Sequence, residues 1–340
     1  MNKLKWFKKN LFNNWYNTVL TILCLVFLFW ILKGIVIWVF TQAQWRVIQV
    51  NIHLFLVGRF PKSLYWRLWI VLGIITTLSV ITWSLFTKQQ NIIKRKFSKF
   101  IIPLLAPIWL LSFAINIWLI GGGFGLKSVS TNLWNGLLLT LLMAVISIVL
   151  SFPIGVLLAL GRTSNLFIIS WFSILYIEIV RGLPLIGILF IAQVMLPLFL
   201  PADLRLDRLI RGIAGLVLFS AAYMAENVRG GLQSIPRGQA EAAKALGLNT
   251  PLVVILIILP QALRAVIPAI VGQFIGLFKD TSLLSLVGLV ELTGIARSIL
   301  AQPQFLGRYA EVYIFIGLIY WVFCYSMSLA SRRLEKQLSN

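Results

Sequence analysis

Long apolar runs constrain the fold of this chain more than any other feature of its sequence. A helix needs about 20 apolar residues to cross a bilayer, and in lipid it must satisfy its own backbone hydrogen bonds. Runs of that length occur at about 18–40, 66–87, 100–120, 132–160, 166–199, 209–228, 260–290 and 309–331. The sequence therefore predicts an all-α polytopic membrane protein with about eight transmembrane helices.

The composition excludes a soluble or disordered chain, because 60% of the 340 residues are hydrophobic and only 11% are charged. The net charge of +21 raises nucleic-acid binding as an alternative. However, the basic residues form short clusters between the apolar runs, as the cytoplasmic flanks of membrane helices do. We therefore expect contact with membrane lipid and no nucleic-acid partner. The first run is also longer than the core of a signal peptide, so we expect it to be retained.

The reactive side chains argue against catalysis and metal binding. Cys24 and Cys324 lie in apolar runs and His53 is the only histidine, which leaves no zinc site, disulfide framework or Cys/His nucleophile. The stretch 121–128 approaches a phosphate-binding loop, but Leu126 stands where that loop has glycine. We expect no catalytic residue, metal or cofactor in this chain, and any ATP to be bound by a partner.

Basic clusters set the expected topology. Those at the N-terminus and after the second run place both ends of the first hairpin in the cytoplasm, and with eight spans the C-terminus returns there. The segment 41–62 is then external, although it contains Arg46, Arg59 and Lys62. A short external subdomain and an interfacial segment are both compatible with it.

A glycine-rich stretch at 121–125 predicts a flexible external linker and a domain boundary. Residues 1–130 are then an N-terminal extension with three transmembrane helices and an external segment near 41–65. Residues 131–340 are a core domain with five.

One polar stretch, 231–251, interrupts the apolar chain and does not fit in lipid. Pro236 suits a first helical turn, Ala240–Leu246 are good helix formers, and Gly247 suits the left-handed residue that ends a helix. Thr250 is predicted to cap a second helix. Small residues on the first helix would let another protein approach it closely, so this stretch is a candidate docking element.

Charged residues inside predicted spans are candidates for the substrate path or for gating, because they are costly there. A straight helix over 166–199 would be about 50 Å long, far more than the membrane core, so we expect a break at Gly182–Pro184. Glu178 lies near the middle of that span, and either contacts substrate or forms a structural pair with Arg181. Glu226 is expected near the inner surface, with a structural or gating role.

A second polar interruption, Lys279, Asp280, Thr281 and Ser282, lies in a later span. Its adjacent cation and anion are suited to the two charged ends of an amino acid, which makes these four residues candidates for substrate contact.

The polar stretch resembles the EAA loop of ABC importer permeases, here at about 229–260. Glu241-Ala242-Ala243, Gly247, Ile257 and Leu259-Pro260 have that loop's spacing. In the family this loop is the cytoplasmic coupling helix, seated in a groove of the ATPase subunit. The resemblance implies that coupling involves Gly238, Glu241, Ala242, Ala243, Ala245, Gly247, Leu259 and Pro260.

Segments 51–61, 151–162 and 196–201 are similar to the polar amino acid branch of that family, most of all to the broad-specificity L-amino acid permeases. The resemblance implies the type I importer fold in a bacterial inner membrane, with five core helices and three added at the N-terminus. It also implies four partners: an ABC ATPase dimer, a second permease subunit (homologous or identical), a periplasmic solute-binding protein and an amino acid substrate.

The expected function is thus that of the permease subunit of an ATP-driven importer for polar L-amino acids. An ion-coupled secondary transporter, using Glu178 or Asp280 as its ion site, is the main alternative, and a membrane scaffold without transport is another. Which amino acids are carried, and whether the permeases form a homodimer or a heterodimer, stay open at this stage.

Overall fold

The structure is a computed structural model that describes residues 10–86, 92–201 and 206–338. Within these ranges the regular elements are all helices, and two isolated β-bridges are the only strand-like pairings. The predicted all-α class is therefore confirmed. Large apolar side chains stay exposed on the helix surfaces, for example Trp30 at 72% and Leu157 at 68%, as expected for helices that face lipid.

Six helices in the described ranges are long and apolar enough to cross a membrane, and a bent pair of helices adds a seventh. The remaining predicted run, 100–120, lies in α5 (Ile92–Gly121), of which Pro107–Gly121 counts only as a shorter apolar helix. The multi-pass architecture stands, whereas the count of eight is not reproduced.

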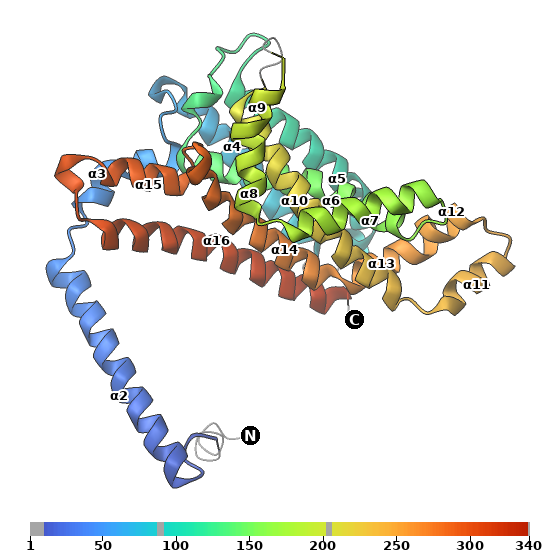
Figure 1. The fold of residues 1–340 in the computed structure, drawn as a ribbon, viewed down its shortest axis with the longest axis horizontal. Helices are drawn as coiled ribbons and strands as arrows, with labels where there is room; N and C mark the ends of the chain where they lie inside the picture. Colours follow the sequence, from blue (N-terminus) through green and yellow to red (C-terminus); the bar gives the residue numbers. More distant parts are fainter. Residues whose placement is uncertain (1–9, 87–91, 202–205, 339–340) are drawn as a thin grey trace.

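The N-terminal third contains α2 (Trp15–Ile37), which continues into the π-helix η1 (Trp38–Gln42), and then α3 (Arg46–Val57). After η2 (Lys62–Leu64), α4 (Tyr65–Phe86) pairs with α5. Helix α2 extends away from the other helices and has no buried residue (Figure 1).

The central helices of the core are α6 (Gly136–Arg162), which follows η3 (Thr131–Leu133), and α10 (Arg208–Ser234). They pack along each other at small residues. A Cβ placed on Gly155 of α6 would lie 2.5 Å from the Cβ of Met224 on α10. Such small residues let helix backbones approach closely in lipid, where helix association depends on packing.

The predicted break in the long span is confirmed. Helix α7 (Phe167–Gly182) is followed by α8 (Leu185–Phe190), η4 (Ile191–Met195) and α9 (Leu196–Phe199), and the two parts are bent by 103°. Leu183 is extended because the ring of Pro184 disfavours a helical conformation in the residue before it.

The rest of the core follows α10. It comprises α11 (Arg237–Ala245), α12 (Thr250–Leu252), η5 (Val253–Ile258), α13 (Leu259–Ala265), α14 (Ile267–Asp280), η6 (Thr281–Val287), α15 (Leu292–Leu300), η7 (Pro303–Phe305) and α16 (Tyr309–Leu338).

The segment 41–62, left open above, is mostly helix α3, which packs on α6, α15 and α16. Val47 and Phe55 of α3 are buried in one apolar cluster with Leu292 and Ile299 of α15. The segment is therefore not a separate subdomain, because it packs against helices that follow residue 130.

Candidate coupling helix and charge cluster

Helix α11 is short, and its C-terminal end has a well-defined geometry. Gly247 adopts a left-handed conformation at φ +83°, as predicted. Its N–H donates to the Lys244 carbonyl at 2.9 Å, and the N–H of Leu248 donates to the Ala243 carbonyl at 3.2 Å. This pair of bonds is the Schellman motif, which satisfies carbonyl groups left free at a helix end. Glycine fits here because it has no Cβ to strain a positive φ.

Most of α11 is accessible to a partner. Among the predicted coupling residues, only Ala243 is buried, and it faces η5, on which α11 packs. Glu241, Ala242 and Ala245 are exposed, and a Cβ on Gly238 would meet nothing within 4 Å. Figure 1 shows α11 projecting beyond the helical bundle.

The second helix of the loop begins one residue earlier than predicted. Asn249, not Thr250, is the N-cap, and its Oδ1 accepts from the Leu252 N–H at 3.1 Å. Asparagine is at least as strong a cap as threonine, and Thr250 then occupies the first helical position. The helix passes through π-helix η5 before Leu259 and Pro260, where the proline lacks the N–H that a regular α-helix would use.

Two helices flank the coupling loop and contact each other. A Cβ on Gly231, near the end of α10, would lie 2.6 Å from the backbone oxygen of Ala262 on α13. Displacement of α11 would therefore act on α10 and α13 together.

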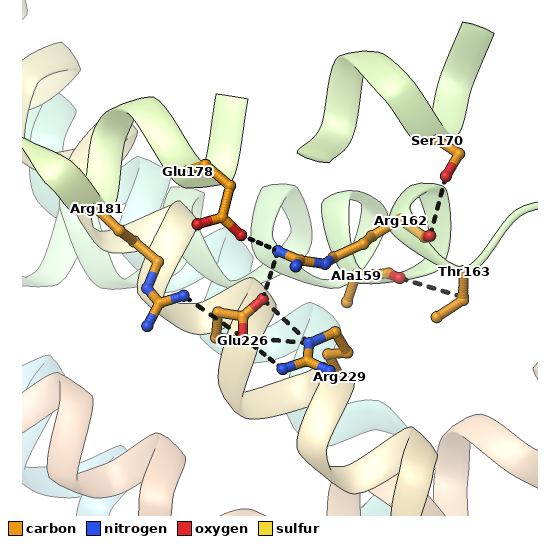
Figure 2. Close-up of polar contacts among 8 residues, drawn as sticks. All are labelled: Ala159, Arg162, Thr163, Ser170, Glu178, Arg181, Glu226 and Arg229. Atoms are coloured by element: carbon orange, nitrogen blue, oxygen red, sulfur yellow. Dashed lines mark hydrogen bonds and ion pairs between the residues drawn. The ribbon is translucent and has the colours of Figure 1, made fainter. Parts of the chain in front are cut away.

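A cluster of five charged side chains joins α6, α7 and α10 (Figure 2). The Glu226 carboxylate accepts hydrogen bonds from Arg162 at 2.9 Å and from Arg229 at 2.8–3.1 Å, and lies 3.5 Å from Arg181. Arg162 also donates to Glu178 at 2.9 Å. One carboxylate thus holds three guanidinium groups from three helices.

The cluster changes the interpretation of Glu178. The structural pair with Arg181, one of the two predicted alternatives, is not among the ion pairs of the described residues, since Glu178 contacts Arg162. Arg162 is the last residue of α6, so Glu178 lies beside a helix end and not at the middle of a straight span. Its side chain is 55% exposed, against 15% for Glu226.

Arg162 is not among the site residues predicted from the sequence. Glu178 lies 16 residues away and Glu226 lies 64 away. The only signal in the sequence is that a basic residue ends one predicted span while two other spans contain an acid. This signal identifies Arg162 only once the packing of the helices is known.

The second polar interruption lies apart from the cluster. The helix changes from α to 3₁₀ between Asp280 and Thr281. Thr281 is buried and donates to the Phe278 carbonyl at 2.7 Å, Ser282 and Asp280 are half-buried, and Lys279 is exposed. None of the four residues contacts Glu178, Arg181 or Glu226 in the described interactions.

Many apolar helices, one of them broken, together with an exposed polar helix α11, define a class of protein: a multi-pass helical membrane protein with a polar helix accessible to a partner. Comparison with known proteins gives the family. Residues 151–340 match the family model described as binding-protein-dependent transport system inner membrane component. The chain belongs to this family, and it is a multi-pass protein of the bacterial inner membrane.

Two relatives match nearly the whole chain. The inner membrane amino-acid ABC transporter permease protein YhdY of Escherichia coli (strain K12) is 39% identical over 98% of this chain and 92% of its own length. The glutamate/glutamine/aspartate/asparagine transport system permease protein BztC of Rhodobacter capsulatus is 35% identical over 98% of this chain and 93% of its own length.

A solved structure, described as the crystal structure of an amino acid ABC transporter with histidines, is 31% identical. The match covers 59% of this chain and 92% of the chain in the solved structure, with a TM-score of 0.54. Together these matches identify the chain as an ABC importer permease and disfavour the ion-coupled secondary transporter. Such a permease is not itself an enzyme.

Proposed function

We propose that this chain is the subunit that forms the translocation path for polar L-amino acids and couples it, through α11, to ATP hydrolysis by a separate ABC ATPase dimer. The observation that carries this proposal is the exposed α11, which ends in a Schellman motif, packs on η5 and connects α10 to α13 along the chain. The names of the full-length relatives support the amino acid class.

In this mechanism, closure of the ATPase subunits moves Glu241, Ala242, Ala245 and Gly247. The movement enters α10 through its C-terminal end at Ser234, about 8 Å along the helix from Arg229. Because Glu226 links α10 to α6 and α7, the charge cluster transmits the displacement to both helices. Glu178, Arg181 and Glu226 therefore act in gating.

The substrate path is assigned to Lys279, Asp280, Thr281 and Ser282, where the helix changes its winding inside a span. Broken helices in transporters present backbone groups and helix ends to substrate. A cation and an anion side by side match the two charged groups of an amino acid.

Two further partners complete the proposed importer. A second permease subunit, homologous or identical, packs against α14, where a Cβ on Gly272 or Gly276 would meet nothing within 4 Å of this chain. A periplasmic solute-binding protein delivers the amino acid to the opposite end of the subunit from α11. We also propose the division into an extension, 1–130, and a core, 131–340. The length of chain matched by the solved structure supports it.

The test is amino acid uptake by the reconstituted complex in proteoliposomes, with ATP inside or with an ion gradient alone. We expect uptake only with ATP and the ATPase. Gly247→Leu should insert normally but lose most ATP-driven uptake, because the altered helix end no longer fits the partner.

A matched control is Gly307→Leu, which changes another left-handed glycine, φ +84°, with equally open surroundings. It carries the same backbone strain and should retain uptake. Equal uptake by the two variants would refute the assignment of α11 as the coupling helix.

A further inference from the structure

A polar cavity lies at the end of the subunit opposite α11. It has a volume of about 390 Å³ and is lined by residues from the segment after α3, from the stretch around η3, from the start of α10 and from the loop before α15. It adjoins the N-terminal end of α10, whereas α11 follows the C-terminal end of this 27-residue helix, about 40 Å away. With α11 in the cytoplasm, as proposed above, the cavity opens on the external side.

The charges around this cavity are two cations and one anion, Arg59, Arg208 and Asp207. Arg208 donates to the Asn132 side-chain oxygen at 2.6 Å. Asp207 accepts from the Leu209 N–H and the Thr131 hydroxyl, each at 2.7 Å, which leaves part of its acceptor capacity unused. Arg59 makes no ion pair or hydrogen bond with any residue that the structure describes, so its guanidinium is available to a ligand.

One wall contributes two polar atoms without a partner. The indole Nε1 of Trp134 and the side-chain Oδ1 of Asn135 have no hydrogen bond, and the two residues are only 9% and 5% exposed. Leaving a buried donor or acceptor unpaired is costly, and native sites with such groups commonly bind a ligand or water. Both atoms lie below the surface of the wall, so the charged groups of Arg59, Arg208 and Asp207 are the ones left for direct contact with a ligand.

The backbone holds this wall tightly. A Cβ on Gly58 would lie 2.3 Å from the Cβ of Asn135, and one on Gly136 would lie 2.6 Å from the Phe55 carbonyl. Both glycines have a positive φ, and the Gly136 N–H donates to Val290 at 3.1 Å. Close backbone contacts on both sides of Asn135 make the site preorganised, which lowers the entropic cost of binding.

We propose that this cavity is an external binding site for the substrate, an α-amino acid in its zwitterionic form. Arg59 binds the α-carboxylate, and Asp207 binds the ammonium group. The second cation, Arg208, favours a side chain with its own carboxylate, so acidic amino acids bind best. This inference rests on the proposed amino acid transport, and it explains why Arg59 lies on the external side against the usual charge distribution.

The test is equilibrium binding of labelled L-glutamate to the permease complex in nanodiscs, without ATP or binding protein. Arg59→Gln and Asp207→Asn should each weaken binding about tenfold or more, because each removes a charge-assisted contact. Asn caps helices as well as Asp, so Asp207→Asn keeps the start of α10. Lys62→Gln, which neutralises an exposed cation outside the cavity, should leave binding within about twofold.

Competition identifies the ligand chemistry. Glutamate should bind more tightly than glutamine, and lysine should bind most weakly. Glutarate, which lacks the ammonium group, should compete at least tenfold less well than glutamate. Equal binding of glutarate would reveal a simple anion site, and no glutamate binding by the wild type would indicate a water-filled cavity. Either result overturns the proposal.

ATP-driven uptake by the same variants in proteoliposomes separates the two proposals. If the wild type imports amino acids while Arg59→Gln and Asp207→Asn bind and import like Lys62→Gln, only the external site is refuted. If no amino acid is imported with ATP, the proposed function itself fails.

Discussion

Neutralising Glu226 should destabilise the permease far more than neutralising Glu178. Glu226 is 15% exposed and receives hydrogen bonds from two arginines with a third nearby, whereas Glu178 is 55% exposed and has one contact, at 2.9 Å. Hydrogen bonds to a charged group contribute about 1.5–3 kcal/mol each, and exposed ion pairs about 0–1 kcal/mol. Because partial exposure weakens the first figure, we expect Glu226→Gln to cost about 2–4 kcal/mol and Glu178→Gln less than about 1 kcal/mol.

Thermal unfolding of the purified permease in detergent measures this difference. At roughly 2–4 °C per kcal/mol for chains of a few hundred residues, Glu226→Gln should lower Tm by at least about 4 °C. Glu178→Gln, the matched control, changes the same functional group on the neighbouring helix and should shift Tm by less than half as much. Equal Tm values would show that Glu226 does not hold the three arginines in place.

The same pair of variants also tests gating. If the cluster transmits movement from α10 to α6 and α7, Glu226→Gln should lower ATP-driven uptake more than ATP hydrolysis. The ATPase would still hydrolyse ATP, but the displacement of α10 would no longer reach α6 and α7. A parallel loss of both activities would point to misfolding. Unchanged uptake would contradict the gating role.

Two other predictions concern stability. Burial raises the pKa of Glu291 from 4.5 to about 7, so the folded state binds the proton more tightly than the unfolded state. The contribution of Glu291 to stability is therefore fully present below pH 4.5 and is lost as pH rises towards 7. Tm should therefore decline between pH 5 and pH 8 in the wild type and stay flatter in Glu291→Gln; parallel curves would contradict this. Gly231→Ala should lower Tm because its Cβ would meet the Ala262 backbone at 2.6 Å, whereas Gly230→Ala, with nothing within 4 Å, should be neutral or stabilising by about 0.5–1 kcal/mol. Equal Tm values for the two alanine variants would contradict the close approach of α10 and α13.

Structural features that depend on residues close together in the sequence were predictable. The break before Pro184 and the left-handed end at Gly247 follow from backbone sterics, which act within a few residues. The shift of the N-cap from Thr250 to Asn249 shows the limit of such reasoning, because both residues can cap a helix and the sequence does not say which one does.

The number of spans and the partners of charged residues were less predictable. Hydropathy does not separate a helix from a break within it, so run 166–199 is a bent pair of helices. Run 100–120 lies in α5, where only the shorter apolar helix Pro107–Gly121 is found in the described ranges. Glu178 was expected to pair with Arg181, one helical turn away, but it pairs with Arg162 on another helix. Helical spacing identifies neighbours within one helix only.

The sequence by itself determined that the chain is helical, that it lies in a membrane and that one polar helix–turn–helix stays outside the lipid. These properties follow from the cost of placing polar groups in hydrocarbon and from local backbone sterics. Only the tertiary structure decided which charges meet. It placed Arg162, Arg181 and Arg229 around Glu226, and it brought Arg59 and Asp207 to the lining of one polar cavity. These contacts depend on how helices distant in sequence pack, and small residues such as Gly155 and Gly231 set how closely the helices approach.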